Sequence, residues 1–178
     1  ALPDGTVLVN TGLLGAVANE AQLAFALSHE IAHALQAHHW REVRETRGKR
    51  IGLIIAGLAG SAFIGDLSTF LAGLGMAAVV NGHTRRLENQ ADRLAVQNLI
   101  ERGYDPREGP RALAMFVERY GNRSTSKLWS NHDSSLLRGS FLTVQLKLQY
   151  PQGQFEGRRV DTAAFQSMRE AMGPVKIQ

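Results

Sequence analysis

Residues 29–33 read H-E-I-A-H, and this pentapeptide constrains the chain more than any other feature of its sequence. In an α-helix, two histidines four residues apart project from the same side, so that His29 and His33 can contact one ion. Glu30 lies about a quarter turn from His29, where its carboxylate can take a proton from an attacking water molecule. The motif therefore predicts a helical metal site with two histidine ligands and a glutamate general base.

The helix that carries this motif is expected to begin after Asn19, a favourable N-cap residue, and to run through Arg41. Large aliphatic residues recur every four positions along it and predict its core-facing stripe. They are Leu23, Leu27, Ile31 and Leu35. His29 and His33 point to the other side of the helix, and we expect them to face a cleft rather than the core.

A catalytic zinc ion needs a third protein ligand, and the chain contains no cysteine to supply it. One candidate is His39, at the position of the third histidine of a metzincin. Position 36 is Gln, however, where a metzincin has the Gly that turns the chain back. On an unbroken helix, His39 would lie about 9 Å beyond His33 along the axis and out of reach of the ion.

The second candidate is Glu88, in the segment E-N-Q-A-D of a helix predicted over residues 84–102, with Gly103 as the residue that follows its end. Asp92 lies one turn later on the same face of that helix. One carboxylate can bind the ion while the other accepts the free N–H of a ligand histidine, which we expect to be His29. Together with the upstream motif, this pattern is typical of a gluzincin site formed by His29, His33 and Glu88.

Four segments resemble metallopeptidase family forty-eight, which includes the HtpX, BepA and Oma types. They are V-N-T-G-L-L at 9–14, L-S-H-E-I-A-H at 27–33, E-N-Q-A-D-R-L-A at 88–95 and G-Y-D-P at 103–106. The resemblance covers roughly residues 2–138. It implies one Zn²⁺ per chain and a zinc endopeptidase that cuts misfolded or membrane-associated polypeptides. It also implies a membrane-associated protein of the bacterial periplasm.

The same family carries an H-P-x-x-x-x-R motif, and N-H-D-S-S-L-L-R keeps its spacing between His132 and Arg138. Asp133 replaces the proline. The resemblance implies that His132 stabilises the oxyanion of the tetrahedral intermediate, or caps the zinc in a self-inhibited state, while Arg138 braces the site. If the zinc is permanently capped, the chain would instead be a membrane-docked chaperone or scaffold.

A long apolar stretch, residues 51–80, separates the two halves of the expected site and is interrupted by Asp66. Each half would be about 22 Å long as a helix, which is too short to cross a bilayer. The stretch matches an apolar insertion found in many members of the family. Two interpretations stay open, a hairpin that dips into a membrane surface and a pair of buried helices that pack tightly against each other.

We expect one domain over residues 1–178, with an α+β, mostly α-helical, zincin-like fold and a small β-sheet. Residues 6–9 predict one strand, whose partner would lie upstream, and residues 141–150 favour a second strand over a helix. A last short helix follows Asp161 and ends near Gly173. The formal charge of +4 suits an anionic surface and predicts no nucleic-acid binding, and an oligomer is compatible with the sequence.

Overall fold

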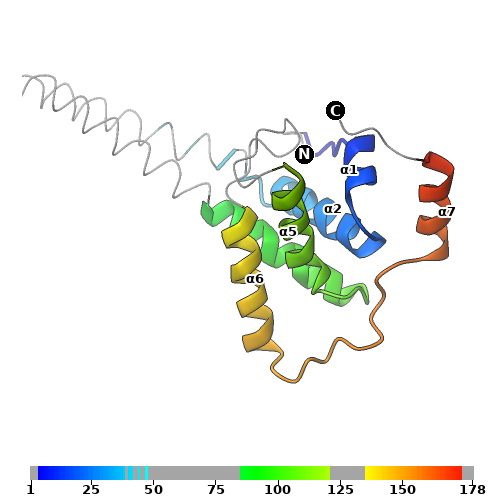
Figure 1. Ribbon diagram of the computed structural model, residues 1–178. Helices are drawn as coiled ribbons and strands as arrows, with labels where there is room; N and C mark the ends of the chain where they lie inside the picture. The colour runs from blue at the N-terminus through cyan, green and yellow to red at the C-terminus, as the bar shows by residue number, and fades with distance from the viewer. Residues whose placement is uncertain are drawn as a thin grey trace, which may run out of the picture.

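A computed structural model describes residues 4–38, 40, 41, 44, 47, 85–120 and 135–173, and most of them are helical (Figure 1). The helices are α1 (Thr11–Ala16), α2 (Glu20–Leu35), α5 (Glu108–Tyr120), α6 (Ser135–Gln149), α7 (Ala163–Met172) and a helical segment at 85–101. The prediction of a mostly α-helical chain is confirmed. The small sheet is not present among these residues, where Tyr104 and Arg159 form one isolated parallel bridge.

Residues 6–10 have no regular secondary structure, so the strand predicted over residues 6–9 is wrong for this structure. Leu8 and Val9 are exposed. A strand forms only where a neighbouring strand exchanges backbone hydrogen bonds with it. None of the residues that the structure describes pairs with this segment.

Helix α2 begins as predicted but ends early. The side chain of Asn19 caps it by accepting a hydrogen bond from Gln22 N at 2.9 Å. At the other end, Ala37 has a φ of +49°, a left-handed conformation that costs a residue with a Cβ atom about 1–2 kcal/mol. The predicted continuous helix through Arg41 is therefore wrong, because α2 stops at Leu35 and helical conformation resumes at His38.

The predicted core face of α2 is also wrong. Of the four large aliphatic residues, Ile31 and Leu35 are 41% and 78% exposed, and the other two are half-buried. The buried stripe instead contains Phe25, His29 and Ala32. Small alanines on this side allow neighbouring helices to approach closely, and the polar histidine is tolerated there because other buried polar groups contact it.

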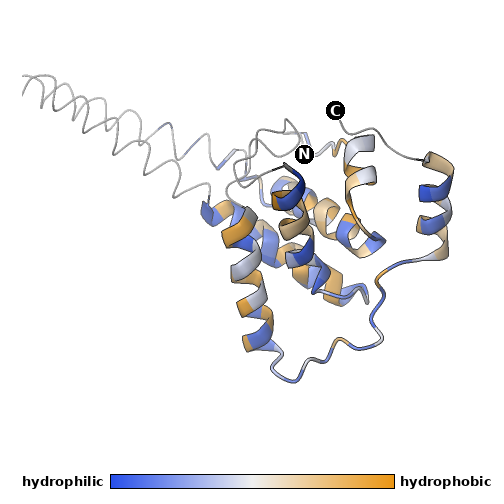
Figure 2. Cartoon of the chain, in the orientation of Figure 1, coloured by the Kyte–Doolittle hydropathy of each residue, from blue (hydrophilic) through white to orange (hydrophobic). Residues whose placement is uncertain are grey.

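The strand predicted over residues 141–150 is wrong, because residues 141–149 belong to helix α6 and residue 150 has no regular secondary structure. Leu142 and Leu146, one turn apart, are buried, whereas Val144 and Leu148 are exposed. Hydrophobic positions are visible along the outer side of this helix (Figure 2). The strand prediction failed because alternate apolar residues over ten positions are equally compatible with a helix that has apolar residues on two sides.

The core lies where α2, the 85–101 segment, α5 and α6 meet. Small side chains bring these helices together. Gly109 of α5 is required at one such approach, because a Cβ atom there would lie 2.9 Å from the ring of Phe25. Leu99 and Leu113 are fully buried beside it. This packing sets the distance between α2 and the 85–101 segment, the two elements that carry the expected site.

Residues 150–162 cross from α6 to α7, which lie on opposite sides of the molecule (Figure 1). Arg159 exchanges backbone hydrogen bonds with Gly103 and Asp105, and Val160 O accepts from Ala21 N at 2.9 Å. Gly103, with a φ of +78°, follows the end of the 85–101 segment as the sequence predicted. The connection therefore joins the C-terminal part of the chain to the start of α2.

Helix α7 ends at Gly173, as predicted, but its N-cap is Thr162 rather than Asp161. The carboxylate of Asp161 instead accepts a hydrogen bond from the backbone N–H of Glu20 in the first turn of α2. It also accepts one from Thr162 N. The predicted capping residue thus helps to cap a different helix, one distant in sequence.

Candidate metal centre

Three side chains from two helices meet in a compact cluster. His29 and His33 come from α2, and Glu88 comes from the 85–101 segment. The Nε2 atoms of the two histidines are 3.0 Å apart. Glu88 Oε2 lies 3.4 Å from His29 Nε2, and Glu88 Oε1 lies 3.2 Å from His33 Nε2. With one donor atom each, all within 4.8 Å of one another, these residues could hold a single metal ion.

The cluster is shielded from solvent on one side more than on the other. The side chains of His29 and Glu88 are 0% and 3% exposed, whereas that of His33 is 18% exposed. Glu30 follows His29 on α2 and is half-buried. The arrangement therefore combines a buried donor set with a partly accessible carboxylate on the same helix.

Asp92 lies behind His29, with Oδ1 of the carboxylate 2.9 Å from His29 Nδ1. Burial raises the pKa of Asp92, but hydrogen bonds and charge from Arg138 and His29 outweigh burial, so its pKa is lowered overall. The ionised carboxylate favours a proton on Nδ1 of His29. Nε2 of His29 is then left with its lone pair directed at the cluster.

Arg138 of α6 joins the two carboxylates. Its Nη1 lies 2.7 Å from Glu88 Oε2, and its Nη2 and Nε donate to the two oxygens of Asp92 at 2.6 and 2.7 Å. The residue is only 4% exposed. The rigid guanidinium fork thus contacts both acids and fixes their orientation.

Some predicted residues cannot be placed beside this cluster. His132, His39 and the apolar stretch 51–80 all lie outside the residues that the structure describes. The helices that it does describe include none that is both long and apolar enough to cross a membrane. The roles predicted for His132, for His39 as the third ligand of a metzincin and for the apolar hairpin therefore stay predictions.

His38, which was not among the predicted site residues, also contacts the cluster. It is 2% exposed, and its Nδ1 lies 3.0 Å from His33 Nδ1. Burial, followed by the charge of His33, lowers the pKa of His38 to about 4. On an unbroken helix, residues five apart point in different directions. Only the left-handed turn at Ala37 returns His38 to the cluster, and alanine gives no sequence signal for such a turn.

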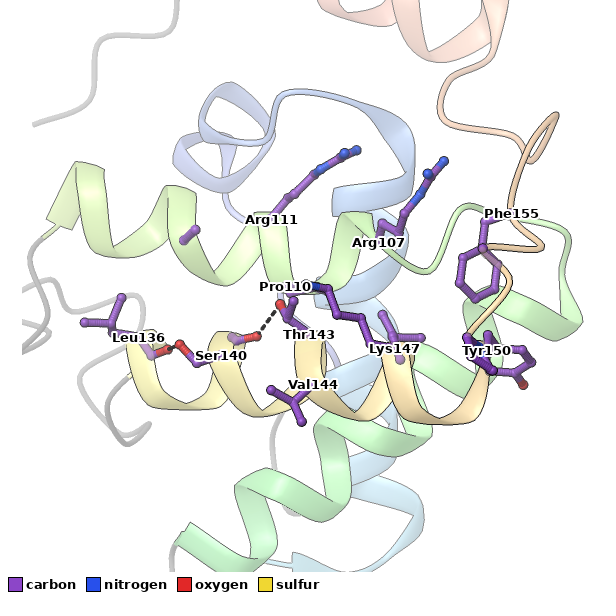
Figure 3. Close-up of a pocket in the computed structure, with 15 residues that line it drawn as sticks. Arg107, Pro110, Arg111, Leu136, Ser140, Thr143, Val144, Lys147, Tyr150 and Phe155 are labelled. Carbon is purple, nitrogen blue, oxygen red and sulfur yellow. Dashed lines mark hydrogen bonds between the residues drawn. The ribbon is translucent and has the colours of Figure 1, made fainter.

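A pocket of about 740 Å³ lies elsewhere, between α5 and α6 (Figure 3). Pro110, Val144 and Phe155 are among the residues that line it. The guanidinium groups of Arg107 and Arg111 extend away from α6, so the pocket is mainly apolar. No residue of the metal cluster lines this pocket, and the centre described above does not open into it.

Comparison with known proteins agrees with the motifs and the geometry. Residues 1–144 match the sequence profile described as Peptidase family M48. The chain belongs to peptidase family M48. The resemblance noted from the sequence motifs is thereby confirmed.

Several curated proteins are similar to this M48 chain. The beta-barrel assembly-enhancing protease of Escherichia coli K12 is 29% identical over 129 residues, which cover 67% of this chain and 26% of the relative. The mitochondrial metalloendopeptidase OMA1 of Arabidopsis thaliana is 29% identical over 142 residues, or 79% of this chain and 28% of the relative. This M48 chain thus spans only about a quarter of the length of these relatives. No solved structure matches it.

Proposed function

We propose that this M48 chain is the catalytic domain of a zinc-dependent endopeptidase, with His29, His33 and Glu88 as the metal ligands and Glu30 as the general base. The observation that carries the proposal is the convergence of donor atoms from three residues on two helices, with separations of 3.0, 3.2 and 3.4 Å. Its membership of a peptidase family supports the same conclusion.

The donor set fits zinc. Zn²⁺ binds imidazole nitrogen and carboxylate oxygen at about 2.0–2.2 Å in a tetrahedron, which corresponds to ligand atoms about 3.3–3.5 Å apart. The separations in the cluster come close to this value. Two histidines and one glutamate also form the ligand set of several catalytic zinc sites, in which the fourth position stays open.

A zinc ion bound there would polarise the scissile carbonyl and make a water molecule more acidic. Glu30, which follows His29 on the same helix, would accept the proton of that water as it attacks and return the proton to the leaving amine. Asp92 would hold His29 in the tautomer that offers Nε2 to the metal, and Arg138 fixes the orientation of Glu88 through its 2.7 Å contact. The contacts of Asp92 with His29 and of Arg138 with Glu88 support this proposal.

The substrate class is part of the proposal. We propose a polypeptide substrate, because relatives are named as proteases, and specifically misfolded or membrane-associated proteins, as the family resemblance implies. Membrane association in the bacterial periplasm, through residues 51–80, completes the proposal. The positive formal charge of the chain, +4, suits contact with an anionic membrane surface.

The test is the Glu30→Gln variant of the full-length protein, assayed with unfolded casein after zinc content has been measured. Glu30→Gln should bind zinc as the unmodified protein does and lose activity by about 10²–10⁴-fold, because the proton acceptor is missing. Glu101→Gln serves as the control, since Glu101 is an exposed acid whose side chain bonds Gln97. Normal turnover by zinc-loaded Glu30→Gln would refute the mechanism.

A further inference from the structure

The two ligand histidines are supported in different ways on the ring edge that faces away from the cluster. Nδ1 of His29 contacts the carboxylate of Asp92. Nδ1 of His33 contacts another imidazole, that of His38, at 3.0 Å. The rings of His33 and His38 meet nearly edge-on, with their planes at 83°. A metal ligand that is held by a second, buried histidine requires a separate explanation.

The contacts of His38 continue into a chain of side-chain hydrogen bonds. Nε2 of His38 lies 3.4 Å from Gln90 Oε1, and Gln90 Nε2 donates to Gln36 Oε1 at 3.3 Å. Gln36 is the C-cap residue of α2, and Gln90 belongs to the same helical segment as Glu88. The chain therefore joins the end of one ligand-bearing helix to the other.

Proton positions along this chain follow from the orientation of His33. Its Nε2 faces His29 and Glu88, so it must be unprotonated to bind a metal, and the proton of His33 resides on Nδ1. His38 then accepts at Nδ1 and carries its own proton on Nε2, where Gln90 Oε1 is the acceptor. Each contact from His33 through His38 and Gln90 to Gln36 then joins one donor to one acceptor.

Charge explains why a neutral imidazole suits the position behind His33 better than a further carboxylate. Glu88 and Asp92 already bury two negative charges, and Arg138 supplies one positive charge to both. A third carboxylate behind His33 would add a charge that Arg138 does not contact. Burial of a charge without a partner is strongly unfavourable, whereas a neutral, hydrogen-bonded His38 avoids that cost.

We propose that His38 is a positioning residue for His33. His38 accepts a hydrogen bond from Nδ1–H of His33. This contact fixes the tautomer of His33 and holds its Nε2 toward His29 and Glu88. The left-handed conformation of Ala37 fits this role, because it turns His38 back onto the site. The inference rests on the proposed metal site, but it concerns the affinity and geometry of that site rather than the chemistry of Glu30.

A matched pair of variants, His38→Asn and His38→Leu, tests the proposal. The two side chains have nearly the same shape, but only asparagine offers an acceptor near the position of Nδ1. The Kd for Zn²⁺, measured by competition with a chromophoric chelator, should rise about 10–100-fold in His38→Leu and much less in His38→Asn. Circular dichroism of both metal-free variants checks that they fold alike.

A second readout follows the proton itself. In the zinc-saturated, ¹⁵N-labelled protein, the Nδ1–H signal of His33 should be protected from exchange. It should be lost in His38→Leu and regained in His38→Asn. Equal zinc affinities for the two variants, together with an unchanged Nδ1–H signal, would overturn the role of His38.

These results separate the inference from the proposed function. If the unmodified protein binds no Zn²⁺, both the metal site and the role of His38 are refuted. If it binds Zn²⁺ and the two His38 variants differ as expected, the role of His38 holds even when Glu30→Gln retains activity. In that case only the catalytic assignment of Glu30 fails.

Discussion

Helices α2 and α6 each carry apolar residues on two sides, and each buries the side that also carries polar residues of the metal centre. In α2, Phe25 and His29 are buried while Leu35 is 78% exposed. In α6, Arg138 and Leu142 are buried, at 4% and 1% exposed. In both helices large aliphatic residues remain exposed, such as Leu35 of α2 and Leu148 of α6, so hydrophobicity alone did not select the buried side.

The two helices differ in what they bring to the centre. α2 supplies two imidazole side chains at four-residue spacing, and α6 supplies the cation that contacts both carboxylates. A buried polar group is tolerated only when it is paired, so each helix depends on the polar groups of the 85–101 segment. The comparison shows that hydrogen bonds and ion pairs between polar side chains of neighbouring helices decided which side of each helix is buried.

The largest effect is expected for Arg138→Met. This change leaves the carboxylates of Glu88 and Asp92 buried without their cation and should lower the free energy of unfolding by about 3–5 kcal/mol. Urea unfolding in the presence of a chelator measures it. Arg119→Met is the control, since Arg119 is exposed and donates one hydrogen bond to Gly15 O, and it should cost about 1 kcal/mol or less. Similar losses in the two variants would contradict the pairing argument.

A smaller but still large effect is expected within α6. Leu142→Ala removes a side chain that is 1% exposed and should lower the free energy of unfolding by about 2–5 kcal/mol. Leu148→Ala changes a side chain that is 77% exposed and should stay within about 0.5 kcal/mol of the unmodified protein. Thermal or urea unfolding compares the two. The reverse order would mean that α6 packs through its other side.

The smallest effect is expected on the exposed stripe of α2. Leu35→Gln should change the free energy of unfolding by no more than about 0.5 kcal/mol, because Leu35 buries little surface. The same unfolding experiment applies, with Phe25→Ala as the buried counterpart on this helix. Phe25 is 0% exposed, and its loss should cost about 3–5 kcal/mol. A large loss for Leu35→Gln would show that this stripe is covered in solution.

Local features were predicted from the sequence with most success. Asn19 caps α2, Gly103 follows the 85–101 segment, and Gly173 ends α7, as expected. These features depend on the backbone preferences of a few neighbouring residues. The failures concern elements whose conformation or orientation depends on distant parts of the chain. The strand expected at residues 141–150 is a helix that packs through Leu142 and Leu146.

By itself, the sequence determined that His29, Glu30 and His33 share one helix, because their spacing and the helical period are local properties. It also contained the motifs that mark family M48. Only the tertiary structure decided that the histidine side of α2 is buried and that Glu88 lies within 3.4 Å of both histidines. Only the tertiary structure showed that the left-handed turn at Ala37 brings His38 into contact with His33. The physical reason is that these contacts depend on how helices pack and on one strained residue, and neither is encoded in the spacing of residues along a single helix.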